Sequence, residues 1–261
     1  MSLKPVKLAF LTLVASAAAA SAQVAYVSDG PGNQPWFTSD FQNAMSTVFG
    51  SYQDDSFTQA GTSVFNPANK FIFIDGGGST AGDFDNYFNT PGVVTALQNW
   101  VAGGGSVYID GGRWPVGDGL DVLNVGFGIN LVEDDNYSYA SYTGTAAGPS
   151  PIFNGASGTS WSGNYFSHDV VTADGATPLI YTGDNNISLA EENYGAGHVM
   201  VGGLVAPTFQ SSGGYALLDN ILGYDAGLAS VPDSGTTLSL LGAGIGALSL
   251  FKRIGSARRK S

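Results

Sequence analysis

The chain has 261 residues, of which 43% are hydrophobic, and it contains no cysteine. Residues 23–230 hold 20 of the 21 acidic residues and only two basic ones, Lys70 and Arg113, for a formal charge of −18. Such an acidic body repels phosphate, which argues against a nucleic-acid partner. The lack of cysteine excludes disulfide bonds, thiolate metal sites and a cysteine nucleophile.

The first 22 residues are typical of a secretory signal peptide. Lys4 and Lys7 precede an apolar run at 8–20, and residues 20–22, Ala-Ser-Ala, supply the small side chains of a cleavage position. The run is too short to span a bilayer comfortably. We therefore expect signal peptidase to release an exported chain that begins at Gln23.

The first half of the body alternates strand and helix patterns. Residues 24–28 predict a strand, and a helix follows from Ser39, interpreted as its cap, to Gly50. Residues 71–74 and 106–109 predict two buried strands, each followed by an Asp-Gly turn. Between them, Thr90-Pro91 predicts a helix start. Strand, helix and strand form a unit whose two strands should be parallel.

The second half is less regular. Residues 130–175 are rich in Gly, Ser, Thr, Asn and Asp, and predict loops and short strands. Strand patterns return at 178–181, 187–190 and 198–203, and a last helix is expected near 212–222, with Gly223 as its stop. The order predicts one α/β domain over 23–230. We expect a flavodoxin-like, mostly parallel sheet with helices on both faces and an irregular insertion at 130–175.

Two carboxylates end neighbouring predicted strands. Asp75 and Asp110 should meet at the carboxyl edge of the sheet, where open α/β sheets bind ligands. They are weak candidates for cation binding or for acid and base chemistry on a sugar. The alternative is that each Asp only closes its strand by bonding to its own turn. Arg113, three residues past Asp110, is a candidate for anion binding or for a simple ion pair.

Other candidates carry weaker signals. Ser79 ends a Gly-rich turn that is a possible anion nest, but no lysine follows at phosphate-loop spacing. His168, followed by an Asp, is a candidate for half of a hydrolytic triad, and His198 opens a predicted strand. For each of these residues a structural or surface role stays open beside the functional one.

Glu133, Asp134 and Asp135 offer a run of oxygen ligands that Ca²⁺ accepts at modest affinity in exported proteins. No EF-hand or repeat spacing accompanies them, so a solvated acidic loop is the alternative. Ca²⁺ is accordingly the one cofactor that the sequence leaves open.

The C-terminal 31 residues, 231–261, have three parts: Val231-Pro232-Asp233-Ser234-Gly235, an apolar run at 236–251, and a basic tail. The run is just long enough for a short transmembrane helix, and the basic tail predicts a cytoplasmic end. This order resembles a PEP-CTERM-type sorting signal in its VPDSG variant. The resemblance implies transient membrane insertion and cleavage by an exosortase, a membrane-embedded, cysteine transpeptidase-like enzyme of Gram-negative bacteria that make extracellular polysaccharide.

The body resembles class I glutamine amidotransferase-like domains, including the ThuA-like branch. The resemblance lies in the pattern strand, GGG, helix, GGGS, strand and DGG over 71–112, and in 187–224, which contains Glu192-Asn193-Tyr194-Gly195. The enzymes of that family carry a Cys after the strand that corresponds to 106–110. Here Gly111-Gly112 follows instead, so the resemblance implies a fold without the family's catalysis.

The sequence therefore predicts an exported protein at the cell surface or in the extracellular matrix. Its α/β body should be noncatalytic and structural or glycan-associated, with polysaccharide as a partner inferred from the sorting resemblance. Two alternatives stay open: an extracellular hydrolase that uses carboxylates near Asp75 and Asp110, and a Ca²⁺-dependent binding module.

Overall fold

The computed structural model describes residues 23–29, 38–77, 81–112, 122–133, 142–163, 165–210 and 213–228. The strands are β1 (Gln23–Ser28), β2 (Gln53–Ser56), β3 (Asn69–Asp75), β4 (Ser106–Asp110), β5 (Val122–Gly126), β6 (Ile129–Glu133), β7 (Thr143–Ala146), β8 (Ser160–Ser162), β9 (Asp169–Ala173), β10 (Thr177–Thr182), β11 (Ile187–Tyr194) and β12 (Gly197–Gly202). The α-helices are α1 (Thr38–Phe49), α2 (Phe57–Ala60), α3 (Ala81–Asn89), α4 (Val93–Ala102) and α5 (Gly214–Leu228). Three short 3₁₀ helices are η2 (Pro151–Phe153), η3 (Gly155–Ser157) and η4 (Pro207–Phe209).

Nine strands form one sheet in the order β2-β1-β3-β4-β12-β11-β10-β7-β8. The strands from β2 to β12 pair in parallel, and the strands from β12 to β8 pair antiparallel. The sheet is therefore mixed α/β, and the expectation of a mostly parallel sheet was wrong. The antiparallel half arises because β11 and β12 are joined by a tight turn, which reverses the chain where a crossover helix would keep it parallel.

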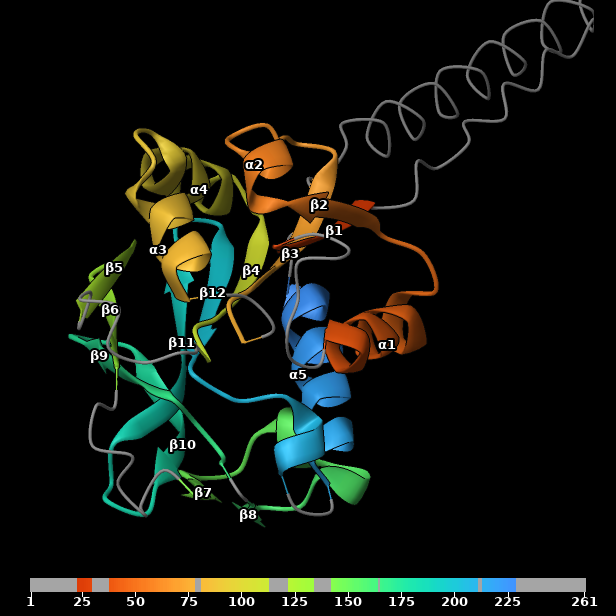
Figure 1. The fold of residues 1–261 in the computed structure, drawn as a ribbon, viewed down its shortest axis with the longest axis vertical. Coiled ribbons are helices and arrows are strands. Elements are labelled where there is room, and N and C mark those ends of the chain that lie inside the picture. Colours follow the sequence, from red (N-terminus) through yellow and green to blue (C-terminus); the bar gives the residue numbers. More distant parts are fainter. Residues whose placement is uncertain are drawn as a thin grey trace, which may run out of the picture.

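Helices cover both faces of the parallel half (Figure 1). One hydrophobic core lies between the sheet and α2, α3 and α4, and the other lies between the sheet and α1 and α5. The alternation along β3 shows how one strand serves both layers: Ile72 and Ile74 belong to the first core, whereas Phe71 and Phe73 belong to the second. Burial on both faces explains why the sequence of β3 contains a continuous apolar run.

The irregular stretch at 130–175 does form short strands, as its composition predicted. β6 and β9 join β5 in a separate antiparallel sheet of three strands, whereas β7 and β8 extend the edge of the main sheet. The small sheet contacts β11 and β12 through β9. The stretch is therefore a decoration of the main sheet that also contributes to it.

Three helix boundaries differ from the sequence expectation. α1 begins at Thr38, so Ser39 lies inside the helix and is not its cap. The sequence did not predict α3. Thr90 follows this helix, and its hydroxyl donates to the Asn86 carbonyl oxygen at 2.8 Å. The helix expected to start at Thr90-Pro91 is α4, which begins at Val93, after Gly92. α5 runs through Gly223 to Leu228, because the burial of this helix outweighs the cost of about 1 kcal/mol for an internal glycine.

Among the described residues, no helix is both long and apolar enough to cross a membrane. The expected transmembrane run at 236–251 and the expected signal peptide at 1–22 lie outside these residues.

Candidate functional site

The ends of β3 and β4 bring the two predicted carboxylates together. Asp75 and Asp110 are direct cross-strand partners in the parallel register, at the carboxyl edge of the sheet. Both residues are fully buried. The prediction that they meet at this edge is confirmed, but they face the protein interior and not open solvent.

Asp75 is held by a tyrosine from the neighbouring strand. The Tyr26 hydroxyl, on β1, donates to Asp75 Oδ2 at 2.5 Å, and the Tyr26 side chain is fully buried. Burial, followed by the adjacent Asp75 charge, raises the pKa of Tyr26 well above its usual value, so the tyrosine stays a donor. The pair links β1 to β3 at the point where the strand order changes direction, which is where open sheets bind ligands.

Asp110 lies in a poorly solvated environment. Neither of its carboxylate oxygens has a hydrogen-bond partner of good geometry among the described residues. Burial and then the Asp75 charge raise the pKa of Asp110 well above its usual value, although the nearby Tyr108 hydroxyl and Leu204 amide act to lower it. A raised pKa favours the protonated form of the carboxyl group, which is the form that a general acid uses.

The space beside Asp110 is too small for a substrate. A hollow lined by Tyr108, Asp110 and Gln210 has a volume of about 10 Å³. A cavity of roughly this size holds one water molecule at most. Asp110 thus has the raised pKa of a possible general acid, but the described residues leave no opening of substrate size beside the Asp75–Asp110 pair.

Close backbone packing keeps this edge dense. A Cβ at Gly76 would lie 2.7 Å from the Phe84 ring and 2.8 Å from the Gly111 carbonyl oxygen. At Gly112 it would lie 2.5 Å from the Leu204 carbonyl oxygen. These glycines were interpreted as turn residues, and here they also allow backbone segments to approach one another.

His168 also reaches the carboxyl edge. Its Nδ1 lies 3.3 Å from the carbonyl oxygen of Gly112, two residues after Asp110. The next residue, buried Asp169, is the cross-strand partner of buried Glu133 in the small sheet. The structure therefore brings three sequence candidates, Asp75, Asp110 and His168, to one region.

The remaining candidates cannot be placed in the same way. Arg113, Ser79, Asp134, Asp135 and the sorting motif lie outside the described residues. The structure describes Glu133 alone of the predicted Ca²⁺ ligands, and among the residues it describes no group of three or more His, Asp or Glu side chains is arranged to hold a metal ion.

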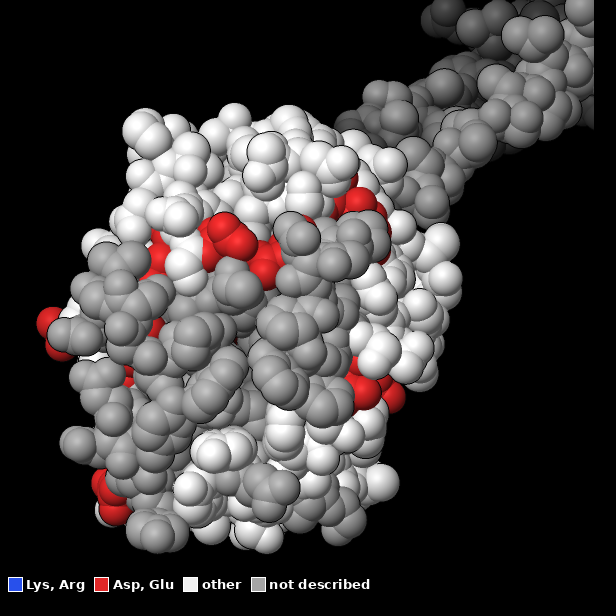
Figure 2. Space-filling model, in the orientation of Figure 1, with Lys and Arg blue, Asp and Glu red and all other residues white. Residues whose placement is uncertain are grey.

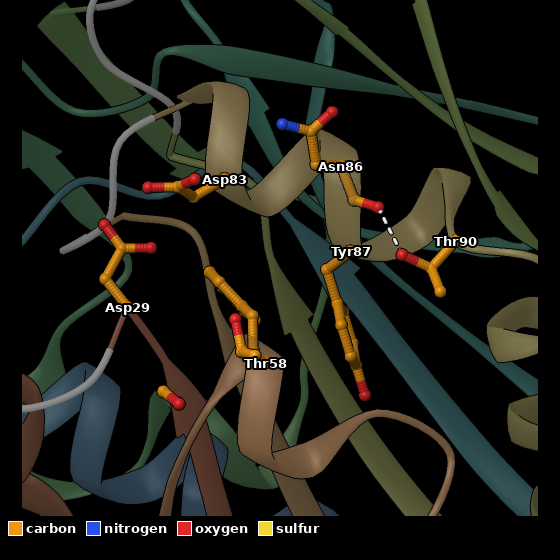
Figure 3. Close-up of a pocket in the computed structure, with 8 residues that line it drawn as sticks. Asp29, Thr58, Asp83, Asn86, Tyr87 and Thr90 are labelled. Atoms are coloured by element: carbon orange, nitrogen blue, oxygen red, sulfur yellow. Dashed lines mark hydrogen bonds between the residues drawn. The ribbon is translucent and has the colours of Figure 1, made fainter.

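A polar hollow lies beside this edge (Figure 3). It has a volume of about 210 Å³. Its lining consists of Asp29, Ser56, Phe57, Thr58, Asp83, Asn86, Tyr87 and Thr90. The carboxylates of Asp29, after β1, and Asp83, on α3, point toward one another across it. Below the range of about 300–1,000 Å³ typical of drug-sized ligands, such a hollow suits a small polar group.

A second buried polar cluster lies at the opposite, amino edge of the sheet. His198 Nδ1 is 2.7 Å from Asp225 Oδ1, and the Ser106 hydroxyl donates to the same oxygen at 2.5 Å. His198 Nε2 forms an ion pair with Glu191 at 3.3 Å. Burial alone would lower the pKa of His198, but the hydrogen bonds to Asp225 and Glu191 outweigh it and raise the pKa to about 9.

Sequence reasoning missed the partners in both clusters. Tyr26, Ser106 and Asp225 are buried polar residues within or beside apolar segments. Each such position is a signal in itself, because a buried polar side chain needs a hydrogen-bond partner. The structural role that the sequence left open for His198 fits this arrangement, since both ring nitrogens are engaged by carboxylates.

The described residues form no basic surface around these sites. Figure 2 shows several patches of Asp and Glu on the drawn face and no described Lys or Arg. Lys70 is the only Lys or Arg among the described residues, and it lies at the start of β3, on the amino edge.

Comparison with known proteins bears on the C-terminus and on the fold. Residues 230–255 match the VPDSG-CTERM motif. This match supports export to the cell surface and implies processing by an exosortase. A search of curated protein sequences gave no match.

Solved structures resemble the body at low sequence identity. A β-galactosidase from Bacillus circulans sp. alkalophilus has a TM-score of 0.50 and 14% identity over 78% of this chain and 30% of its own. A cytoplasmic protein from Salmonella typhimurium has a TM-score of 0.51 and 13% identity over 78% of this chain and 98% of its own. The chain spans 27–30% of the length of the β-galactosidases from G. stearothermophilus and B. circulans. At such identity these likenesses bear on the fold alone.

Proposed function

We propose that the protein is an exosortase substrate displayed at the surface of a Gram-negative bacterium, and that its α/β body binds neutral polysaccharide without transforming it. The VPDSG-CTERM match over 230–255 carries this proposal, because such a signal directs a folded domain to the exterior. In this proposal residues 1–22 are removed on export, and residues 236–251 anchor the precursor in the membrane transiently.

We infer that the body is a flavodoxin-like, amidotransferase-like domain that has lost the family's chemistry. The parallel strands run in the order β2-β1-β3-β4-β12, which matches the 2-1-3-4-5 order of flavodoxin-like sheets. Gly111 and Gly112 follow β4, and the chain has no cysteine to act as nucleophile there.

In this proposal the polar hollow at the carboxyl edge holds polar groups of one sugar unit, and the rest of the polysaccharide lies outside it. Sugar hydroxyls donate to carboxylates such as those of Asp29 and Asp83, and hydroxyl and amide groups of Thr58 and Asn86 complete the polar lining. A body with a formal charge of −18 repels anionic polymers, which favours neutral chains.

Binding is tested by titrating neutral and anionic polysaccharides into residues 23–230 by calorimetry, with and without Ca²⁺. We expect a neutral polymer to bind and Asp83→Asn to weaken it by about tenfold, the effect of one lost charge-assisted hydrogen bond. Asp184→Asn, in the turn between β10 and β11, is the matched control and should bind normally. Binding that appears only with Ca²⁺ would favour the Ca²⁺-dependent module instead.

A hydrolase is the second candidate, because the raised pKa of Asp110 beside Asp75 is what a general acid requires. Likeness to part of a β-galactosidase does not transfer that enzyme's activity. Release of reducing sugar from a polysaccharide that binds, abolished by Asp110→Asn with binding retained, would establish the hydrolase. Binding without release supports the noncatalytic proposal.

A further inference from the structure

Both ends of the described chain lie at the amino edge of the sheet. Gln23, the first described residue, opens β1 and pairs with Asn69 at the start of β3. At the other end, α5 begins near Asp110 at the carboxyl edge and runs back along the sheet, so that its last turn reaches Ser106 and His198, which open β4 and β12. Figure 1 shows α5 beside the parallel strands, on the same side of the sheet as α1.

The last turn of α5 is clasped to the sheet by Asp225. Its carboxylate contacts His198 and Ser106, and Asp225 and Ser106 are fully buried. A carboxylate at a helix C-terminus is unfavourable next to the helix dipole, so a cationic His198 stabilises this end of the helix in particular. The end of α5 is thereby fixed, where an unanchored helix end frays.

The sorting motif follows α5 almost at once. Val231 is three residues beyond Leu228, the last residue of α5. Three residues span at most about 11 Å when fully extended. An enzyme that acts on Val231–Gly235 must therefore approach the end of a folded α5 closely, or α5 must unwind.

We propose that the amino edge of the sheet faces the exosortase and its membrane, and that the clasp of Asp225, His198 and Ser106 limits processing by holding the folded body against the cleavage motif. This inference rests on exosortase processing of Val231–Gly235. It places the polar hollow on the side that points away from the membrane.

Pulse-chase conversion of the full chain to its shorter form, in a bacterium whose exosortase acts on VPDSG-type signals, tests the inference. A six-residue Gly-Ser insertion after Ala229 should speed processing, by up to about tenfold, which corresponds to about 1.4 kcal/mol. The same insertion between Asp184 and Asn185, at the far end of the sheet, is the control and should leave the rate unchanged. Asp225→Asn should also speed processing, and the insertion should add little to that variant.

An unchanged or slower rate with the insertion after Ala229 overturns the inference while leaving exosortase processing intact. If the wild type is converted and deletion of residues 231–235 stops conversion, processing depends on the motif, as proposed. If the wild type is never converted, the processing proposal is refuted, and the inference falls with it.

The orientation has a separate test that does not depend on rates. Because the chain has no cysteine, a single one is uniquely labelled. Ala196→Cys lies in the exposed turn between β11 and β12 at the amino edge, and Asp184→Cys lies in an exposed turn at the opposite end. In the membrane-bound precursor, a lipid-attached quencher should quench a fluorophore at position 196 and spare one at 184. Equal quenching, or the reverse, contradicts the orientation.

Discussion

Replacing His198 by Gln should remove a pH-dependent part of the stability. His198 is buried between Asp225 and Glu191, and its pKa is raised to about 9, against about 6.5 in an unfolded chain. The difference of about 2.5 units corresponds to about 3 kcal/mol at 1.36 kcal/mol per unit. Because the native state binds the proton more tightly, this stabilisation is complete below about pH 6.5 and is lost as the pH rises through 9.

Urea unfolding of residues 23–230 between pH 6 and pH 10 measures this effect. The wild type should lose about 3 kcal/mol of unfolding free energy relative to His198→Gln across that range. Subtracting the two curves removes the contributions of ionisable groups that behave alike in the two proteins. His168→Gln is the matched control: the loss of stability as the pH rises through 9 should persist in it, because His198, Asp225 and Glu191 are all retained.

Nuclear magnetic resonance provides a direct check, since the protein has only two histidines. One imidazole should titrate near pH 9 and should be missing from the His198→Gln spectrum. Parallel stability curves for wild type and His198→Gln, or a His198 pKa below 7, would refute the account of the clasp.

Three further predictions concern the carboxyl edge. Asp110→Asn should stabilise the protein at pH 7 by on the order of 1 kcal/mol or more, because burial disfavours the ionised carboxylate and asparagine carries no charge. At pH 3 this gain should be absent, because the carboxyl group is protonated in the folded and the unfolded protein; urea unfolding at both pH values measures the difference. Gly76→Ala should cost about 1–3 kcal/mol because its Cβ would meet backbone and an aromatic ring, whereas Gly148→Ala, where no atom lies within 4 Å, should be nearly neutral. Tyr26→Phe should cost about 1–3 kcal/mol, because a buried Asp75 loses a donor; equal melting temperatures for wild type and Tyr26→Phe would contradict this.

The parallel centre of the fold could be predicted because its signals are local. Four consecutive apolar residues at 71–74, an Asp-Gly turn and a helix before the next such run determine a parallel pair. Once the pair is parallel, Asp75 and Asp110 must lie at the same edge, and they do. The antiparallel half could not be predicted in the same way, because short strands between polar turns carry no signal of which neighbour they pair with.

The environment of the candidate residues depends on contacts between distant positions. The Tyr26 hydroxyl meets Asp75 across 49 residues, and Ser106 meets Asp225 across 119. Periodicity identifies which face a residue occupies, but it cannot identify the partner on that face. For the same reason, the sequence left the accessibility of Asp75 and Asp110 open. The close packing around Gly76 and Gly112 is one part of the tertiary structure that buries both residues.

The topology explains why a sorting tail and a ligand site would occupy opposite ends of this protein. In a parallel sheet every strand ends at the carboxyl edge, where open α/β sheets bind ligands. A crossover helix that follows the last parallel strand must run back toward the amino edge, and α5, which follows β12, does so. A tail attached after α5 therefore leaves from the edge opposite the polar hollow. One additional parallel strand after α5 would move the tail to the carboxyl edge and turn the hollow toward the membrane. Whether the domain ends in a helix or in a strand therefore determines whether the hollow faces away from the membrane or toward it.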